Sequence, residues 1–437
     1  MAKQTSELVM KKYSYWLDTI NKDFLKKKNL PIKVDVLIVG FGYTGLNAAL
    51  EIIKDGRSVC VIDKNDFGAG CSSKNGGQIS NLLKPSLKKL SKKYGIEKAK
   101  SIRGEGVNAV NWLIKFIKSE KLECDFKRDG LFFGAHTPTF FKKIVTECKD
   151  LKKNEGIETE IISKSEQKNE INSDLYHGGV VYPQHASLNA AKYHKELMKK
   201  AIKLGVDVIP KCEMISFKKH LNVFSVLTNK GSIEAKNLVV ATNGYTSSVT
   251  PWINNRNIPI GIYVLATQEL PDGYVDSLFP SNRHITDTCR VIYYFRPSPD
   301  RKRILFGGRV SSREISLSRS AHLLFKDLRR VFPDLPELEI SHSWMGYVSY
   351  TFDHLPHIGF ENGYYYSMGY CGSGIALSSY LGMKLGKKVI GDKNGSTAFD
   401  DIKFPTRPFY NGRPWFLPAI VELYKFRDTR EIRRYIN

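Results

Sequence analysis

The sequence of 437 residues lacks any long apolar run. Its longest apolar stretch, residues 34–50, is broken by three glycines and by polar side chains, whereas a membrane-spanning helix needs about 20 mostly apolar residues. Residues 1–12 also lack the apolar core and cleavage site of a signal peptide. We therefore expect a soluble, cytoplasmic protein without a transmembrane segment.

Several short chemical motifs are absent as well. The seven cysteines are widely spaced and form no CxxC pair, so the sequence indicates neither a zinc site nor a disulfide framework. It also contains no GxSxG, GxxxxGK(S/T) or HExxH motif, which argues against common serine hydrolases, P-loop enzymes and zinc proteases. We predict no metal site.

Positive charge is abundant, with 67 Lys and Arg against 44 Asp and Glu, a net charge of +23. The excess is spread in isolated pairs, and residues 26–28 form the only lysine triplet. Nucleic-acid-binding proteins more often gather charge and aromatic side chains on one surface, so we expect no nucleic-acid partner. Peripheral contact with an anionic membrane face or a partner protein stays open.

A glycine-rich turn follows the first apolar strand pattern. Residues 33–39 read KVDVLIV, residues 40–45 read GFGYTG, and a helical pattern continues to residue 54. A second short apolar run, residues 58–62, ends at Asp63. This order predicts a dinucleotide-binding unit, because the glycines permit a tight turn and close approach of phosphates while the acid can bind ribose. The candidate contacts are Gly40, Gly42, Tyr43, Thr44, Gly45, Asp63 and Lys64.

Two later segments favour FAD over NAD as the dinucleotide. The apolar run of residues 236–240 leads into Ala241 and Thr242 of an A-T-x-G pattern. A second glycine-rich helix start comes near the C-terminus, at Gly372, Ser373, Gly374 and Ile375. A tight turn without a ligand is the alternative interpretation of this second start.

The motifs together resemble one enzyme family. The leader Y-S-Y-W (residues 13–16), the GxGxxG turn and GAGCSSKNGGQ (residues 68–78) are similar to the FAD-dependent D-amino-acid oxidase/sarcosine oxidase superfamily. Within it, the chain is most similar to γ-glutamylputrescine oxidase-type amine oxidoreductases, over roughly residues 13–414. The resemblance implies further FAD contacts at Ser72, Ser73, Asn75, Gly76, Gly77, Gln78 and Met214.

The resemblance also implies an α/β fold. It consists of a Rossmann-like FAD-binding domain of the two-dinucleotide-binding type, interleaved with an α+β substrate domain that has a mostly antiparallel sheet. The expected division is a leader (1–32), an FAD-binding domain (33–119, 172–250 and 345–390), a substrate domain (120–171 and 251–344) and a C-terminal extension (391–437).

Two positions depart from relatives that bind FAD covalently. Gly346 stands where some relatives have the linking cysteine, and Lys74 where others have a histidine. We therefore expect non-covalent FAD. Ser373 and its neighbour Cys371 also depart from the family's usual C-terminal glycine motif, which leaves the identity of the substrate open.

The activity that the resemblance implies is oxidation of the C–N bond of a secondary or N-substituted amine or amino acid. Hydride passes to the flavin, and water hydrolyses the resulting imine. Oxygen is the expected acceptor of an oxidase; a dehydrogenase that passes electrons to a quinone or a partner protein is the alternative. A flavin-binding subunit or RNA-modifying factor is the alternative from another class.

Three residues are candidates for contact with the small-molecule amine. Tyr263 is an aromatic candidate for the pocket wall, although tyrosine is also common in ordinary sheet packing. Arg309 follows two glycines and could bind a carboxylate, or form a structural ion pair. His354 could take the amine proton, or be an ordinary loop histidine.

Overall fold

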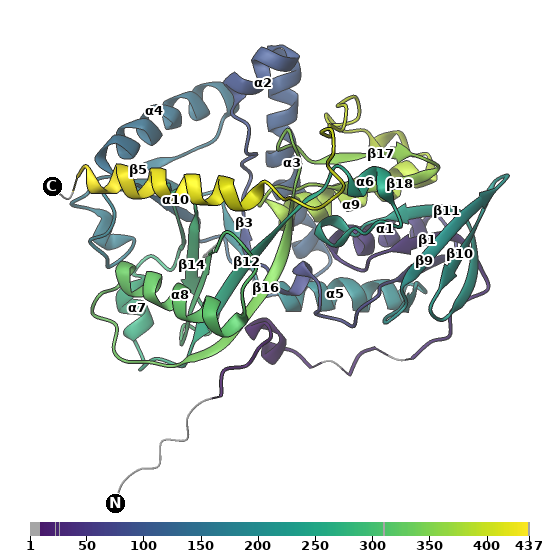
Figure 1. The fold of residues 1–437 in the computed structure, drawn as a ribbon, viewed down its shortest axis with the longest axis horizontal. Coiled ribbons are helices and arrows are strands. Elements are labelled where there is room, and N and C mark those ends of the chain that lie inside the picture. Colours follow the sequence, from purple (N-terminus) through teal and green to yellow (C-terminus); the bar gives the residue numbers. More distant parts are fainter. Residues whose placement is uncertain (1–8, 22, 26, 309–310, 436–437) are drawn as a thin grey trace, which may run out of the picture.

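The structure of the protein, a computed structural model, describes residues 9–435 except 22, 26, 309 and 310. Two eight-stranded sheets organise it (Figure 1). Both sheets are assembled from segments that are far apart in the sequence, as the family resemblance implies. The α/β fold with a mostly antiparallel second sheet is confirmed.

The first sheet is built on parallel strands. Its central β1 lies between β2 and β11 and is parallel to both. The run VDVLIV is almost wholly buried, as is typical of a parallel strand covered on both faces. The strands in spatial order are β17 (His357–Glu361), β18 (Tyr364–Met368), β11 (Gly231–Val240), β1 (Lys33–Val39), β2 (Val59–Ile62) and β8 (Asp207–Ile209), with β10 (Val223–Thr228) and β9 (Met214–His220) attached to β11.

The second sheet is antiparallel except where β13 pairs with β4. Its strands in spatial order are β16 (Ile340–Tyr350), β12 (Ile258–Thr267), β15 (Ile304–Gly308), β14 (Tyr293–Pro297), β13 (His284–Asp287), β4 (Leu131–Gly134), β6 (Gly179–Tyr182) and β5 (Glu160–Ile162). Two strands depart from the expected division of the chain. β16 crosses the expected boundary between residues 344 and 345, and it pairs with β12 on both sides of that boundary. β6 lies in segment 172–250, which we expected in the FAD-binding domain, but it pairs with β4 and β5.

Helices cover the sheets, and α1 and α9 pack closely against each other. The α-helices are α1 (Tyr43–Lys54), α2 (Leu87–Tyr94), α3 (Ile96–Ser119), α4 (Pro138–Glu155), α5 (Ala190–Lys203), α6 (Pro251–Asn254), α7 (Tyr274–Leu278), α8 (Leu317–Val331), α9 (Gly374–Ile390) and α10 (Leu417–Arg433). Short 3-10 turns are η1 (Tyr15–Thr19), η2 (Cys71–Ser73), η3 (Gln167–Asn169), η4 (Asn243–Tyr245) and η5 (Lys393–Gly395), and β3 (Gln78–Ile79) pairs with β7 (Ala186–Ser187).

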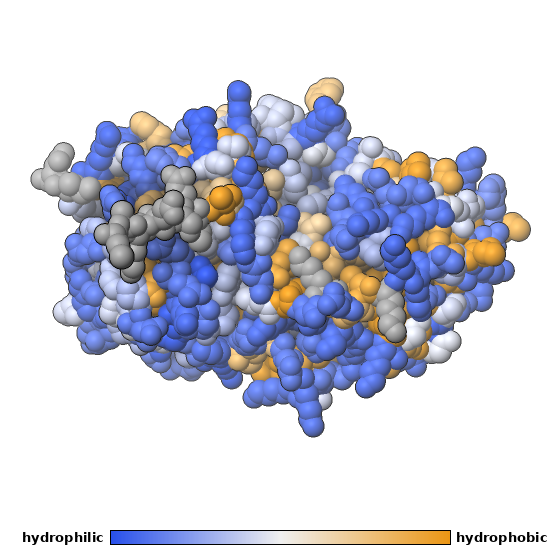
Figure 2. All heavy atoms as spheres, turned by 90° about the horizontal axis from the view of Figure 1, so that it is seen from below, coloured by the Kyte–Doolittle hydropathy of each residue, from blue (hydrophilic) through white to orange (hydrophobic). Residues whose placement is uncertain are grey.

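The surface of the protein is mostly hydrophilic on the face shown in Figure 2. Hydrophilic side chains cover most of the face in Figure 2, and apolar side chains form several separate groups between them. Within the described part of the chain, no helix combines the length and the apolar character needed to cross a membrane.

Candidate active site

A cavity of about 920 Å³ is lined by both sheets and by α10. Its wall includes the glycine turn after β1, strands β4 and β13 of the antiparallel sheet, and the first two turns of α10. It therefore joins the expected dinucleotide site to the expected substrate domain in one space. Pockets of several hundred cubic ångströms, mostly apolar with a few polar groups, are typical of cofactor and substrate sites.

The glycine turn leaves no room for side chains at two positions. Gly40 has a φ of +103°, and a Cβ on it would lie 2.8 Å from the carbonyl oxygen of Ala241. A Cβ on Gly45 would lie 1.9 Å from the carbonyl oxygen of Gly40. The first glycine thus permits the turn, and the last permits close packing of α1 on the turn, as the sequence predicts.

Asp63 lies at the end of β2, beside this turn. Its carboxylate accepts hydrogen bonds from the backbone N–H groups of Phe41 at 3.3 Å and Asn65 at 2.9 Å. Burial raises the pKa of the Asp63 carboxyl above its usual value, although these two bonds oppose the shift. An acid lining the cavity at this strand end is placed to bind ribose hydroxyls.

Two helices begin at the cavity wall. Neither α1 nor α9 has a side chain that caps its first turn, and Ser373 at the start of α9 instead donates its hydroxyl hydrogen bond to the carbonyl of Leu82, at 2.7 Å. The helices pack tightly because glycines face α1: a Cβ on Gly382 would lie 2.5 Å from the carbonyl oxygen of Thr44. Uncapped helix N-termini offer N–H groups and partial positive charge to phosphates or to electron-rich ring atoms.

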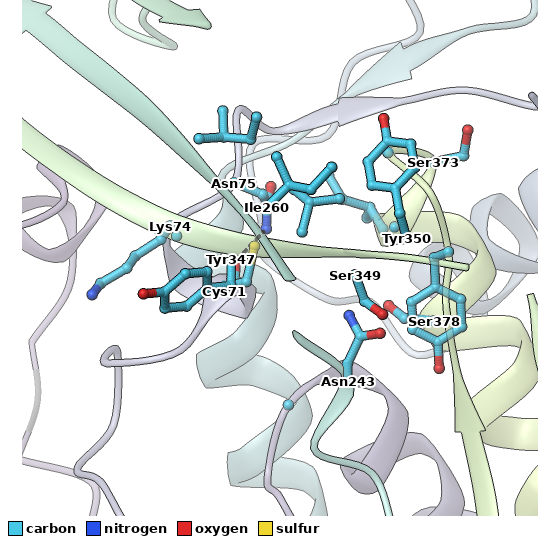
Figure 3. A pocket seen from close by; sticks show the side chains of 18 of the residues that line it. Cys71, Lys74, Asn75, Asn243, Ile260, Tyr347, Ser349, Tyr350, Ser373 and Ser378 are labelled. Atoms are coloured by element: carbon cyan, nitrogen blue, oxygen red, sulfur yellow. Dashed lines mark hydrogen bonds between the residues drawn. The ribbon is translucent and has the colours of Figure 1, made fainter. Parts of the chain in front are cut away.

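Most of the expected cofactor contacts share this wall. Those that line the cavity are Gly40, Gly42, Tyr43, Thr44, Asp63, Lys64, Ser72, Asn75, Gly76, Gln78, Met214, Ala241, Thr242, Gly372, Ser373, Gly374 and Ile375. The donor set and the crowded glycine turn therefore fit FAD. Figure 3 shows part of this wall, with Asn75 and Cys71 near its centre and Ser373 at one side.

Three expected contacts lie behind the wall and support it. Gly45 packs on the turn, and the Ser73 hydroxyl lies 2.9 Å from Nδ1 of buried His194. A Cβ on Gly77 would lie 2.2 Å from the carbonyl oxygen of Leu188. These residues shape the cavity without lining it.

Tyr263 does not reach the cavity, which corrects the expectation that it forms part of the pocket wall. The side chain is 2% exposed and packs in the core of the antiparallel sheet. Its hydroxyl accepts a hydrogen bond from the backbone N–H of Ile315 at 2.9 Å. Since neighbouring residues of a strand point to opposite faces, the residues of β12 that line the cavity are Ile258, Ile260 and Ile262.

The other two candidates have different outcomes. Arg309 lies outside the described residues. His354 lines the cavity with a φ of +61°. Burial, with smaller contributions from Lys89 and Lys84, lowers the pKa of the His354 imidazole, so the ring is neutral at physiological pH. A neutral histidine can accept a proton.

The sequence analysis missed the cover of the cavity. Five residues at and just before the start of α10 line it: Phe416, Leu417, Ile420, Val421 and Tyr424. The 3-to-4-residue spacing of the apolar side chains could have indicated one buried helix face. It could not indicate which surface that face covers.

A cluster of His136, Asp428 and Glu431 fixes α10 in place. Their ligand atoms all lie within 4.8 Å of one another, but the Arg290 guanidinium already binds both carboxylates at 2.8 Å. Because a bound cation would have to compete with this guanidinium, we interpret the cluster as a structural ion-pair network.

A cavity that joins a dinucleotide-type glycine turn to a second, mostly antiparallel sheet fits the class of flavin-dependent oxidoreductases. The family model DAO, described as "FAD dependent oxidoreductase", matches residues 35–387, and the chain belongs to this family. The resemblance noted from the sequence and the expectation of FAD are thereby confirmed.

Curated relatives match nearly the whole chain. It is 27% identical over 425 residues to the probable oxidoreductase OrdL of Haemophilus influenzae, covering 95% of this chain and 97% of the relative. It is 27% identical over 415 residues to γ-glutamylputrescine oxidoreductase of Escherichia coli, covering 92% and 94%. Among solved structures, glycine oxidase from Geobacillus kaustophilus has a TM-score of 0.71 at 18% identity, covering 86% of this chain and 99% of that one. The last likeness shows the fold.

Proposed function

We propose that the protein oxidises the C–N bond of a secondary or N-substituted amine or amino acid. The observation that carries this proposal is the single cavity shared by the glycine turn and the antiparallel sheet. The names of its relatives agree with it, since they include γ-glutamylputrescine oxidoreductase and a D-amino acid dehydrogenase of Helicobacter pylori, 21% identical over 373 residues.

The chain's own residues bind FAD and the amine, orient them toward each other and exclude water from them. FAD, when bound, supplies a ring that accepts hydride. Gly40 and Gly42 would hold the pyrophosphate of FAD, and Asp63 would hold its ribose. The start of α9 would lie near its flavin ring. Apolar side chains such as Leu131, Phe133 and Ile260 line the other part of the cavity. They favour the neutral form of an amine because burial without a partner charge disfavours the ammonium ion.

His354 is the proposed acceptor of the amine proton. The ring lies at the cavity wall, and burial, followed by Lys89 and Lys84, lowers its pKa while Asp353 opposes the shift. The ring is therefore unprotonated at neutral pH and has a free nitrogen lone pair for a proton. The imine formed after hydride transfer would be hydrolysed by water.

The test is an anaerobic visible spectrum of the FAD-loaded protein during titration with secondary amines and amino acids. We expect loss of the yellow absorbance with at least one of these compounds. Rapid return of colour in air would identify an oxidase, and slow return a dehydrogenase with another acceptor. A protein that binds no FAD, or whose bound FAD no amine or amino acid reduces, would refute the proposal. The matched control is alcohols of the same carbon skeleton, which should leave the colour unchanged.

A further inference from the structure

The C-terminal helix α10 has one face on the cavity and the other toward solvent. Leu417 and Val421 line the cavity, and Asp428, further along the helix, binds Arg290. Because these three positions are spaced by one and two helical turns, they share one face, and the opposite face points away from the cavity. In Figure 1, α10 runs along the near side of the molecule, in front of the antiparallel sheet.

The outward face begins with a group of apolar side chains. Trp415, in the turn before α10, is 74% exposed, and Phe426 is 63% exposed. Ala419 and Leu423 lie between them in the sequence and are exposed as well. Successive members of the group are three or four residues apart, so their side chains are neighbours on one helix surface. Single exposed apolar residues are ordinary, whereas an aligned group of large ones indicates an interaction surface.

The second half of the same face is basic. Arg430 and Arg433 continue the spacing of the apolar group, and Arg427 lies beside them on the helix. All three side chains are exposed. None of them forms an ion pair with a carboxylate in the part of the chain that the structure describes.

The acids of α10 do not offset these charges. Asp428 and Glu431 are both bound by Arg290. Glu422 pairs with Lys425 on the helix itself, at 3.7 Å. The outward face therefore combines exposed aromatic and aliphatic side chains with a net positive charge.

We propose that the outward face of α10 docks the protein on a membrane surface that contains anionic phospholipids. Trp415, Leu423 and Phe426 would enter the boundary between headgroups and acyl chains, and the three arginines would bind lipid phosphates. A second copy bound through the same face fits less well, because the arginines of the two copies would repel each other. RNA also fits less well, because Leu423 offers no ring on which a base can stack. The inference does not depend on the reaction that the enzyme catalyses.

The first experiment measures cosedimentation of the FAD-loaded protein with lipid vesicles. One set of vesicles is pure phosphatidylcholine, and the other contains three parts phosphatidylcholine to one part phosphatidylglycerol. At low salt we expect at least about tenfold tighter binding to the anionic vesicles than to the neutral ones. Binding should weaken as the salt concentration rises, because salt screens the attraction between the arginines and the lipid phosphates.

One double variant tests the apolar half of the face. Trp415→Ser combined with Phe426→Ser should weaken binding to the anionic vesicles at least about tenfold, because it removes the side chains that enter the lipid. Neither residue lines the cavity, and both are exposed, so the midpoint of urea unfolding should not change.

Two triple variants test the basic half. Replacement of the three arginines by Gln should weaken binding at low salt about 10- to 100-fold. The matched control is Lys88→Gln, Lys92→Gln and Lys115→Gln together, which removes the same charge from exposed positions of α2 and α3. Because the control leaves the outward face of α10 intact, it should change binding less than about threefold.

A second experiment locates the contact at Trp415. Among the five tryptophans, Trp415 is the one with an exposed side chain. Lipids with brominated acyl chains quench the fluorescence of tryptophans that reach them, so the wild type should lose part of its fluorescence on binding such vesicles. Trp415→Phe keeps an aromatic ring and should still cosediment with the vesicles, but without the quenching.

Several outcomes would overturn the proposal. Absence of vesicle binding would do so directly, and an equal loss of binding in the two triple variants would assign it to the general surface charge. Quenching that survives in Trp415→Phe would place the contact elsewhere. Self-association without vesicle binding, abolished by Phe426→Ser, would assign the face to a second copy of the chain. Binding of single-stranded RNA without vesicle binding, abolished by the arginine variant, would assign it to RNA.

Discussion

Arg290 binds Asp428 through two separate groups. Its backbone N–H donates to one carboxylate oxygen at 2.9 Å, and its guanidinium Nη1 donates to the other at 2.8 Å. The N–H of Val291 adds a third bond at 3.1 Å, and Asp428 is only 6% exposed. Because Arg290 and Val291 line the cavity, this contact fixes α10 to the cavity wall.

Replacement of Asp428 should release α10. Asp428→Ala leaves two backbone N–H groups and part of the Arg290 charge without their partner, which costs about 3 kcal/mol. We expect faster amide hydrogen exchange over Leu417–Arg433, measured by mass spectrometry, while exchange in β1 and β11 stays unchanged. Glu422→Ala is the control, since Glu422 pairs with Lys425 at 3.7 Å on the exposed side and should change stability by less than about 0.5 kcal/mol. Equal exchange in the two variants would contradict this role.

Substitution of Gly40 should affect both stability and cofactor binding. Gly40→Ala combines a left-handed backbone with a contact of 2.8 Å to the Ala241 carbonyl, and we expect a loss of about 2–4 kcal/mol with at least tenfold weaker FAD binding. Gly56→Ala is the matched control, because Gly56 has a φ of +83° and nothing within 4 Å of an added Cβ. It should cost only about 1 kcal/mol. Urea unfolding and FAD fluorescence titration measure the two effects, and similar losses in both variants would refute the crowding argument.

Asp287 should make stability depend on pH. The carboxyl is 4% exposed, and burial raises its pKa from 3.8 to about 7, with a contribution from the charge of Asp428. Between these values the folded state keeps a proton that the unfolded state loses, so the free energy of unfolding falls as pH rises from about 4 to about 7 and then levels off. The fall is at most about 4 kcal/mol.

Asp287→Asn keeps an oxygen that can accept from the N–H groups of Cys289 and Tyr293 but does not titrate. Urea unfolding at several pH values should therefore show a smaller decline with pH in this range for the variant than for the wild type. An unchanged decline would show that another group is responsible.

The FAD should be released when the protein is denatured. Gly346 has no side chain to which FAD could be attached covalently. The Cys71 thiol lies close to Gly346, with Sγ 3.4 Å from where a Cβ on Gly346 would be. Burial raises the pKa of this thiol to about 11. It is therefore protonated at neutral pH and a weak nucleophile. After acid precipitation we expect the yellow colour in the supernatant, for wild type and Cys71→Ser alike. Colour in the wild-type pellet that Cys71→Ser abolishes would show a covalent bond.

The sequence predicted the part of the site that depends on local geometry. The GFGYTG turn and Asp63 belong to one strand–helix–strand segment, and the spacing of their residues fixes where they lie. The side of β12 on which Tyr263 lies could not be predicted in the same way. Shifting the register of β12 by one residue would move every side chain of the strand from the cavity side to the core side. β6 lies in a segment that we expected in the FAD-binding domain, and it pairs with β4 and β5 of the second sheet. Its sequence GVVY is buried at all four positions and would suit either sheet.

The role of α10 depends on a partner far away in the chain. In the sequence, Asp428 looks like an ordinary surface acid. In the structure it binds Arg290, which lies 138 residues earlier in the chain.

The position of α10 in the chain has a consequence for biosynthesis. Every strand of both sheets precedes α10 in the sequence, so the ribosome synthesises the sheets that line the cavity before it synthesises α10. The strands that line the cavity are therefore synthesised before the helix that closes one side of it.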